Sequence, residues 1–213
     1  MDYLQLAIIG LPILFFSLTV HEFAHAWTAN RMGDPTAKQM GRMSLNPLVH
    51  LDLMGLLVMV GSGFRFGWAK PVPINPFNFR DWRKGTFLVS AAGPASNIIL
   101  AVAAAAVFHL VSFLGLDPQS QSIAHQFLYF MILVNCALAF FNMIPLPPLD
   151  GSKILFSLLP PRYENFAISL ERYGPMLLIA VIFIGFMMPG GRSIIWMVIG
   201  PFVDLMLTIL IGK

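Results

Sequence analysis

The stretch LQLAIIGLPILFFSLTVHEFAHAWTA, residues 4–29, decides the fold of this chain. It is apolar over more than the roughly 20 residues that a helix needs to cross a bilayer core. Across the whole sequence 57% of the residues are hydrophobic and 11% are charged, whereas soluble domains carry about 25% charged residues. The sequence therefore predicts an integral membrane protein built from helices.

Other apolar stretches follow this one, and together they define the fold class. We expect an all-α polytopic membrane protein with about five transmembrane helices. A shorter apolar stretch, residues 51–63, is short for a span; we expect it to be re-entrant or interfacial, and the alternative is that it crosses the bilayer. Residues 37–45 are expected to form either a connecting loop or a small β-hairpin near the candidate site. The expected spans are residues 4–29, 86–116, 127–144, 175–188 and 194–211.

The positive charges serve as topology signals. The net charge of +3 comes without any dense basic run, so nucleic acid is not an expected partner. If residues 51–63 do not cross the bilayer, all 13 lysines and arginines except Arg192 fall on the same face. Basic residues gather on the cytoplasmic side of membrane proteins. We therefore expect a multi-pass protein of the cell membrane, with its N-terminus outside and its candidate site near the cytoplasmic face.

The motif His21-Glu22-Phe23-Ala24-His25 lies near the end of the first apolar stretch. On a helix this spacing places two imidazoles one turn apart on one face with a glutamate beside them, which is typical of a zinc site with a general base. Ionisable residues at membrane depth are rare and usually functional. The alternative interpretation is a pair of interfacial histidines hydrogen-bonded to Glu22.

A catalytic zinc ion takes three protein ligands and one water, so a third ligand must come from elsewhere in the chain. Asp150 is the best candidate from the residues alone, because it follows a proline-rich break at membrane depth, where irregular backbone must be buried or line a cavity. An ordinary turn at a helix end is the alternative for this break. His50 remains a rival ligand, whereas His109 and His125 are expected near the opposite face.

Three segments, in this order, resemble the site-2 protease family of intramembrane zinc metalloproteases. The first is the motif of His21 to His25. The second, residues 92–97 (AGPASN), resembles the Gly-Pro-x-x-Asn element of the family's third core helix. The third, residues 142–151 (NMIPLPPLDG), matches the family pattern Asn-x-x-Pro-x-x-x-x-Asp-Gly. The resemblance implies that Asp150 is the third metal ligand.

The resemblance also implies an activity and its partners. We expect a zinc endopeptidase with one Zn²⁺ per chain that uses Glu22 as its general base and cuts transmembrane protein or peptide substrates. Asn97 and Asn142 are expected to bind the scissile backbone or the oxyanion, and the alternative is that they hold helices together. Membrane lipid is the other expected partner. The ligand types favour zinc without excluding other divalent metals.

The expected domain is single, residues 1–213, with a catalytic core over about 4–158 and a closing helical hairpin over about 173–213. No nucleotide-binding, PDZ-like or CBS-like domain is expected. A transporter is disfavoured, because the polar groups gather at one face and no internal repeat is present. A non-catalytic scaffold is disfavoured by Glu22, which zinc binding does not require.

Overall fold

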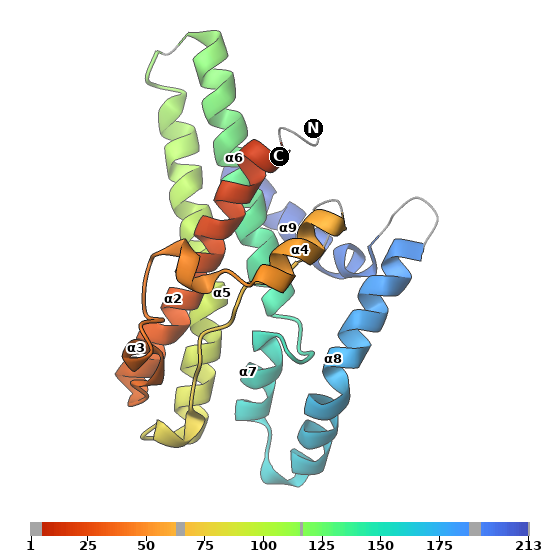
Figure 1. The fold of residues 1–213 in the computed structure, drawn as a ribbon. Helices are drawn as coiled ribbons and strands as arrows, with labels where there is room; N and C mark the ends of the chain where they lie inside the picture. The colour runs from red at the N-terminus through yellow and green to blue at the C-terminus, as the bar shows by residue number, and fades with distance from the viewer. Residues whose placement is uncertain (1–5, 63–66, 116, 188–192, 213) are drawn as a thin grey trace. The chain divides into compact units, whose positions relative to one another are not determined.

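The structure is a computed structural model that describes residues 6–62, 67–115, 117–187 and 193–212 (Figure 1). Within these ranges every regular element is a helix, which confirms the all-α prediction. The described helices include five that are long and apolar enough to cross a membrane, as expected. These are Ile8–Met32, Trp82–Val111, Pro118–Asn142, Pro161–Gly185 and Ile194–Ile211.

Two compact units make up the chain, Met1–Gly93 and Pro94–Lys213, and helix α5 (Trp82–Val111) contributes to both. The first unit is built around helix α2 (Leu11–Met32), which follows a short π-helix, Leu6–Gly10. Pro12 lies in the first turn of α2, directly after the π-helix, and the first turn of a helix accommodates proline.

The short apolar stretch forms helix α4 (Leu53–Gly61), which begins where the Asp52 side chain accepts a hydrogen bond from Gly55 N at 2.9 Å. Its nine residues extend over only about 13 Å, less than half of a bilayer core of about 30 Å. It therefore cannot span, as its length predicted. The end of the predicted segment, Gly63, lies outside the described residues.

The predicted β-hairpin over residues 37–45 is wrong. The segment contains helix α3 (Thr36–Gln39), and the described chain that follows it forms turns without a strand. The Asp34 carboxylate accepts from Thr36 N at 3.1 Å, which starts a helical turn. Arg42 N then bonds to Ala37 O at 2.8 Å, so local bonds use donors that a strand ladder would require.

Asp34 also holds a later segment of the first unit. It is fully buried, and it accepts from Asn75 N at 2.7 Å, from Asn78 Nδ2 at 2.8 Å and from the Thr36 hydroxyl. Burial raises the pKa of the Asp34 carboxyl, but the hydrogen bonds from Thr36, Asn78 and Asn75 outweigh burial and hold its pKa below the ordinary value. The ionised carboxylate therefore stabilises this unit.

We expect Asp34→Ala to destabilise the protein by about 2–4 kcal/mol, because buried donors lose a charged acceptor. The pKa of Asp34 is lower in the folded state than in the unfolded state. The stability that its ionised carboxylate contributes is therefore complete above the ordinary Asp pKa of about 3.9, and it is lost as pH falls through the pKa of the folded protein. Thermal unfolding in detergent at several pH values measures both effects.

The control is Asp81→Ala, which removes an exposed carboxylate that accepts a hydrogen bond from Lys84 N at 3.0 Å. An Asp34→Ala midpoint no lower than that of Asp81→Ala would contradict the prediction.

The second unit contains the remainder of α5 with helices α6 (Pro118–Asn142), α7 (Asp150–Leu158), α8 (Glu164–Met187) and α9 (Ile194–Ile211). Small residues of α5 allow close contact with α6 and α9. The buried cluster that joins these three helices contains Ala101, Ala104, Ala105, Ile132, Cys136, Val203 and Leu207. Figure 1 shows α6 running beside the C-terminal half of α5.

Two helices of this unit begin earlier than the sequence predicted. Helix α6 starts at Pro118 because the Asp117 carboxylate accepts from Gln119 N and Ser120 N at 3.1 and 3.0 Å. Helix α8 runs through Pro175, since membrane helices tolerate an internal proline. The connection of the expected closing hairpin, residues 188–192, lies outside the described residues.

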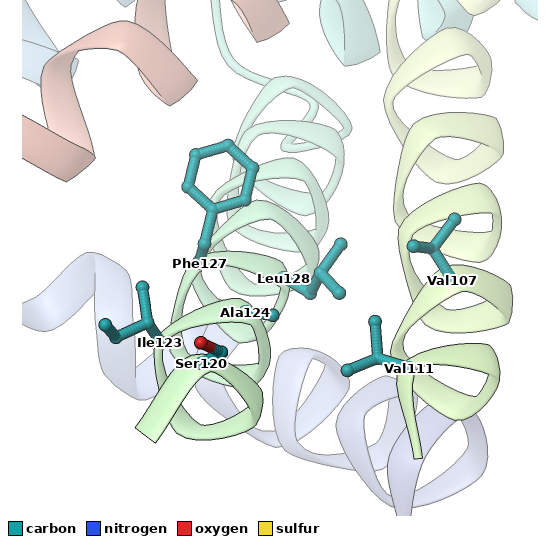
Figure 2. Close-up of a pocket in the computed structure, with 7 residues that line it drawn as sticks. All are labelled: Val107, Val111, Ser120, Ile123, Ala124, Phe127 and Leu128. Carbon is teal, nitrogen blue, oxygen red and sulfur yellow. The ribbon is translucent and has the colours of Figure 1, made fainter. Parts of the chain in front are cut away.

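A groove of about 530 Å³ lies between the C-terminal end of α5 and the N-terminal end of α6 (Figure 2). Its lining is apolar apart from Ser120 and includes Val107, Ile123 and Phe127. No candidate site residue lines it. Such a surface is ordinary for helices that face lipid.

Candidate metal and catalytic site

The imidazoles of His21 and His25 lie together on one face of α2, as the one-turn spacing predicted. Both are buried, with 4% and 5% of their surface exposed. Their Nε2 atoms are 3.0 Å apart, and the two rings meet edge to face. Two nitrogens bound to one tetrahedral zinc ion would lie about 3.3 Å apart, so this nitrogen pair fits a shared ion.

A backbone carbonyl orients one of these rings. His25 Nδ1 lies 2.7 Å from Val89 O in α5. A carbonyl oxygen only accepts, so Nδ1 carries the hydrogen and Nε2 keeps its lone pair. Metal-binding histidines commonly use their second nitrogen in this way. The contact therefore fixes the tautomer that a zinc ligand needs.

The imidazoles of His21 and His25 pack directly against Gly93 of α5. A Cβ atom on this residue would lie 2.6 Å from His21 Nε2 and against His25 Nε2. Real Cβ atoms do not approach ring atoms so closely, so any side chain at position 93 would displace the imidazoles. The two imidazoles keep these positions only because residue 93 has no side chain, and we call His21, His25 and Gly93 the cradle.

Glu22 is partly buried, and its Oε2 accepts a hydrogen bond from Val72 N at 2.8 Å. Val72 belongs to the irregular segment between α4 and α5. Its side chain is buried against Ala26 and Ala37. Sequence reasoning missed this contact, and the only sequence signal was a valine between two prolines, which indicates a stiff extended segment.

Asp150 lies in the second unit, as the first residue of α7, and is 7% exposed. The chain before it makes tight turns, and Leu149 N bonds to Leu146 O at 3.0 Å. Gly151 is required next to it, because a Cβ there would lie 2.6 Å from Ile144 O. The proline-rich break is therefore a compact turn that holds a buried carboxylate at a helix start.

The two candidate asparagines are placed differently within the second unit. Asn97 is fully buried, and its Nδ2 donates to Asn135 Oδ1 at 2.9 Å. Asn135 in turn donates to Met131 O at 2.8 Å. Asn142 is partly exposed and donates to Leu138 O at 3.0 Å. Asn97 thus bridges α5 and α6, whereas the Asn142 amide bonds to its own helix.

The rival histidines bond to backbone carbonyls. His50 Nε2 lies 2.8 Å from Ser44 O in the loop before α4. His109 Nε2 lies 2.8 Å from Leu210 O, and His125 Nε2 lies 3.2 Å from Phe108 O. Each of these contacts connects helix ends or loops, as in ordinary structural histidines.

The sequence model of peptidase family M50 matches residues 109–184. Over 185 residues the chain is 38% identical to "Putative zinc metalloprotease YwhC" of Bacillus subtilis (strain 168), which covers 86% of this chain and 82% of that protein. The chain belongs to peptidase family M50, the site-2 proteases.

Two relatives of lower identity are also described as putative zinc metalloproteases. "Putative zinc metalloprotease Rip2" of Mycolicibacterium smegmatis is 27% identical over 189 residues, which is 85% of this chain and 69% of that protein. The Rip2 protein of Mycobacterium tuberculosis (strain H37Rv) is 28% identical over 171 residues, or 78% of this chain and 62% of that protein. No solved structure matches the chain.

Membership of the M50 family confirms the resemblance and makes this chain a multi-pass zinc metalloprotease with zinc as its cofactor. The imidazole pair of the first unit has the donor chemistry that zinc requires. The five apolar helices agree with a membrane-integral member of the family.

Proposed function

We propose that this M50 protein is an intramembrane endopeptidase that hydrolyses peptide bonds within or near transmembrane segments. The observation that carries the proposal is the cradle, in which His21 and His25 of the membrane-length helix α2 pack against Gly93 of α5, with Glu22 next to His21 in the sequence. A buried imidazole pair with one fixed tautomer and a neighbouring carboxylate has the parts needed for metal-assisted hydrolysis. Both units then act as one protease domain.

His21, His25 and Asp150 would hold one zinc ion. A zinc ion bound there would supply the Lewis-acid chemistry that activates a water molecule and the scissile carbonyl group. Glu22 accepts a proton from that water at its carboxylate and later delivers it to the nitrogen of the leaving amine. Val89 O keeps the His25 ring in place throughout, because its hydrogen bond is to the nitrogen that does not face the cradle.

Two asparagines are the remaining candidates for contacts to substrate. The Asn142 amide would bind the scissile backbone or the oxyanion, and its partial exposure supports this role. Asn97 would act at the same step, although its bond to Asn135 also gives it a helix-bridging role.

The substrate would be a transmembrane protein or peptide that unwinds locally, because a peptide bond in an intact helix is protected by its own hydrogen bonds. The exposed lysines and arginines of the first unit, such as Lys38, Arg80 and Arg83, favour a site near the cytoplasmic face with the N-terminus outside.

Zinc removal from proteoliposomes tests this function. The purified protein is reconstituted with a fluorescent transmembrane test peptide, and its cleavage is followed before chelation, after chelation and after zinc is returned. We expect chelation to lower the rate by at least about a hundredfold and zinc to restore it. A cleavage rate that survives chelation, with zinc shown to be absent by mass spectrometry, would refute the proposal.

A further inference from the structure

An extended segment of the first unit, residues 70–75, lies over the candidate general base, and we call it the strap. Figure 1 shows it as part of the long trace that connects α4 to α5. Its sequence is Lys-Pro-Val-Pro-Ile-Asn. The prolines at 71 and 73 restrict φ and have no N–H. Val72 is therefore the sole backbone donor of the Pro-Val-Pro triplet, and it donates to Glu22 Oε2 at 2.8 Å.

The strap is anchored on both sides of this contact. Before it, Lys70 N donates to His50 O at 2.8 Å. The Arg42 guanidinium donates to Lys70 O at 2.8 Å and to Pro71 O at 3.2 Å. After it, Asn75 N donates to the buried Asp34 carboxylate at 2.7 Å. The Val72 N–H is thus held by the fold at a fixed position against Glu22.

We propose that the Val72 N–H is a positioning group that assigns the two oxygens of Glu22 to different tasks. This inference rests on the proposed function, in which Glu22 is the general base. Oε2 accepts from an N–H donor, and a proton on that oxygen would make it a poorer acceptor than the carbonyl oxygen that it remains when Oε1 is protonated. The proton from water therefore goes to Oε1, while Oε2 accepts the Val72 hydrogen bond in both protonation states.

The contact also restricts the motion of the base. A glutamate side chain has three rotatable bonds, and a base that points away from the water contributes nothing to the reaction. Fixing one oxygen of a planar carboxylate also fixes the direction of the other. The strap therefore acts on the chemical step, and its loss should lower kcat with little effect on KM.

Backbone ester substitution tests this role without changing a side chain. Val72 is replaced by the corresponding α-hydroxy acid through nonsense suppression, so that an oxygen replaces the N–H. We expect kcat to fall by about 10–100-fold, with KM and zinc content within about twofold of wild type. The matched control is the same substitution at Val49, a valine outside the strap whose N–H bonds to Asn46 O. It should lower kcat by less than about threefold.

Amide hydrogen exchange gives a second readout that does not require activity or metal. In metal-free protein labelled with ¹⁵N-valine and ¹⁵N-lysine, we expect Glu22→Ala to speed exchange of the Val72 amide at least about tenfold, with the Lys70 amide changed much less. Equal exchange at Val72 in both proteins, or a Val72 ester whose kcat matches that of the Val49 ester, would overturn the inference. Equal cleavage by wild type and Glu22→Gln would instead overturn the proposed function, and the positioning role with it.

Discussion

Replacing Glu22 with glutamine is expected to lower the cleavage rate by about 10²–10⁴-fold, because an amide cannot take a proton from water. The replacement has nearly the same shape as glutamate, and its amide oxygen can still accept from the Val72 N–H. His21 and His25 are unchanged, so zinc content should stay within about twofold of wild type. The loss should appear in kcat.

The measurement combines cleavage of a transmembrane peptide in proteoliposomes with zinc per chain by mass spectrometry. Glu171→Gln is the matched control, since this exposed glutamate of α8 undergoes the same chemical change outside the candidate site. It should cleave at close to the wild-type rate. Full activity of Glu22→Gln would exclude Glu22 as the base. If Glu22→Gln loses zinc as well as activity, Glu22 is needed to form the metal site.

Gly93→Ala is expected to lower both zinc affinity and cleavage by about 10–100-fold, the range seen when the support of metal ligands is disturbed. The new Cβ would lie 2.6 Å from His21 Nε2, so the imidazoles must shift away from their shared position. In a helix interior the same change normally stabilises by about 1 kcal/mol. If Gly93→Ala unfolds at a temperature no lower than wild type but binds zinc more weakly, the weaker binding comes from the displaced imidazoles and not from a general loss of stability.

Zinc titration by calorimetry and the peptide assay measure the two losses. Gly61→Ala provides the control, because a Cβ at that position in α4 would meet nothing within 4 Å. It should leave zinc affinity and cleavage unchanged. Gly93→Val extends the series, since its larger side chain would fill more of the cradle. Normal zinc binding by both Gly93 variants would refute the cradle.

Local patterns accounted for most of what was predicted correctly. The HExxH spacing placed His21 and His25 on one helix face because α-helical geometry repeats every 3.6 residues. The length of the apolar runs predicted five spans and a short α4, since bilayer thickness sets the length of a helix that crosses. The errors occurred where a carboxylate side chain accepts hydrogen bonds from backbone N–H groups a few residues later in the chain. Asp117 starts α6 earlier than predicted, and Asp34 forms a turn where a hairpin was expected.

The sequence by itself determined that this chain spans a membrane and has a histidine pair with a glutamate on its first span, because hydrophobicity and helical spacing are local properties. Only the tertiary structure decided which backbone groups hold these side chains. Val72 lies 50 residues after Glu22, and Val89 lies 64 residues after His25. Contacts at such separations depend on the path of the whole intervening chain, which no local pattern encodes.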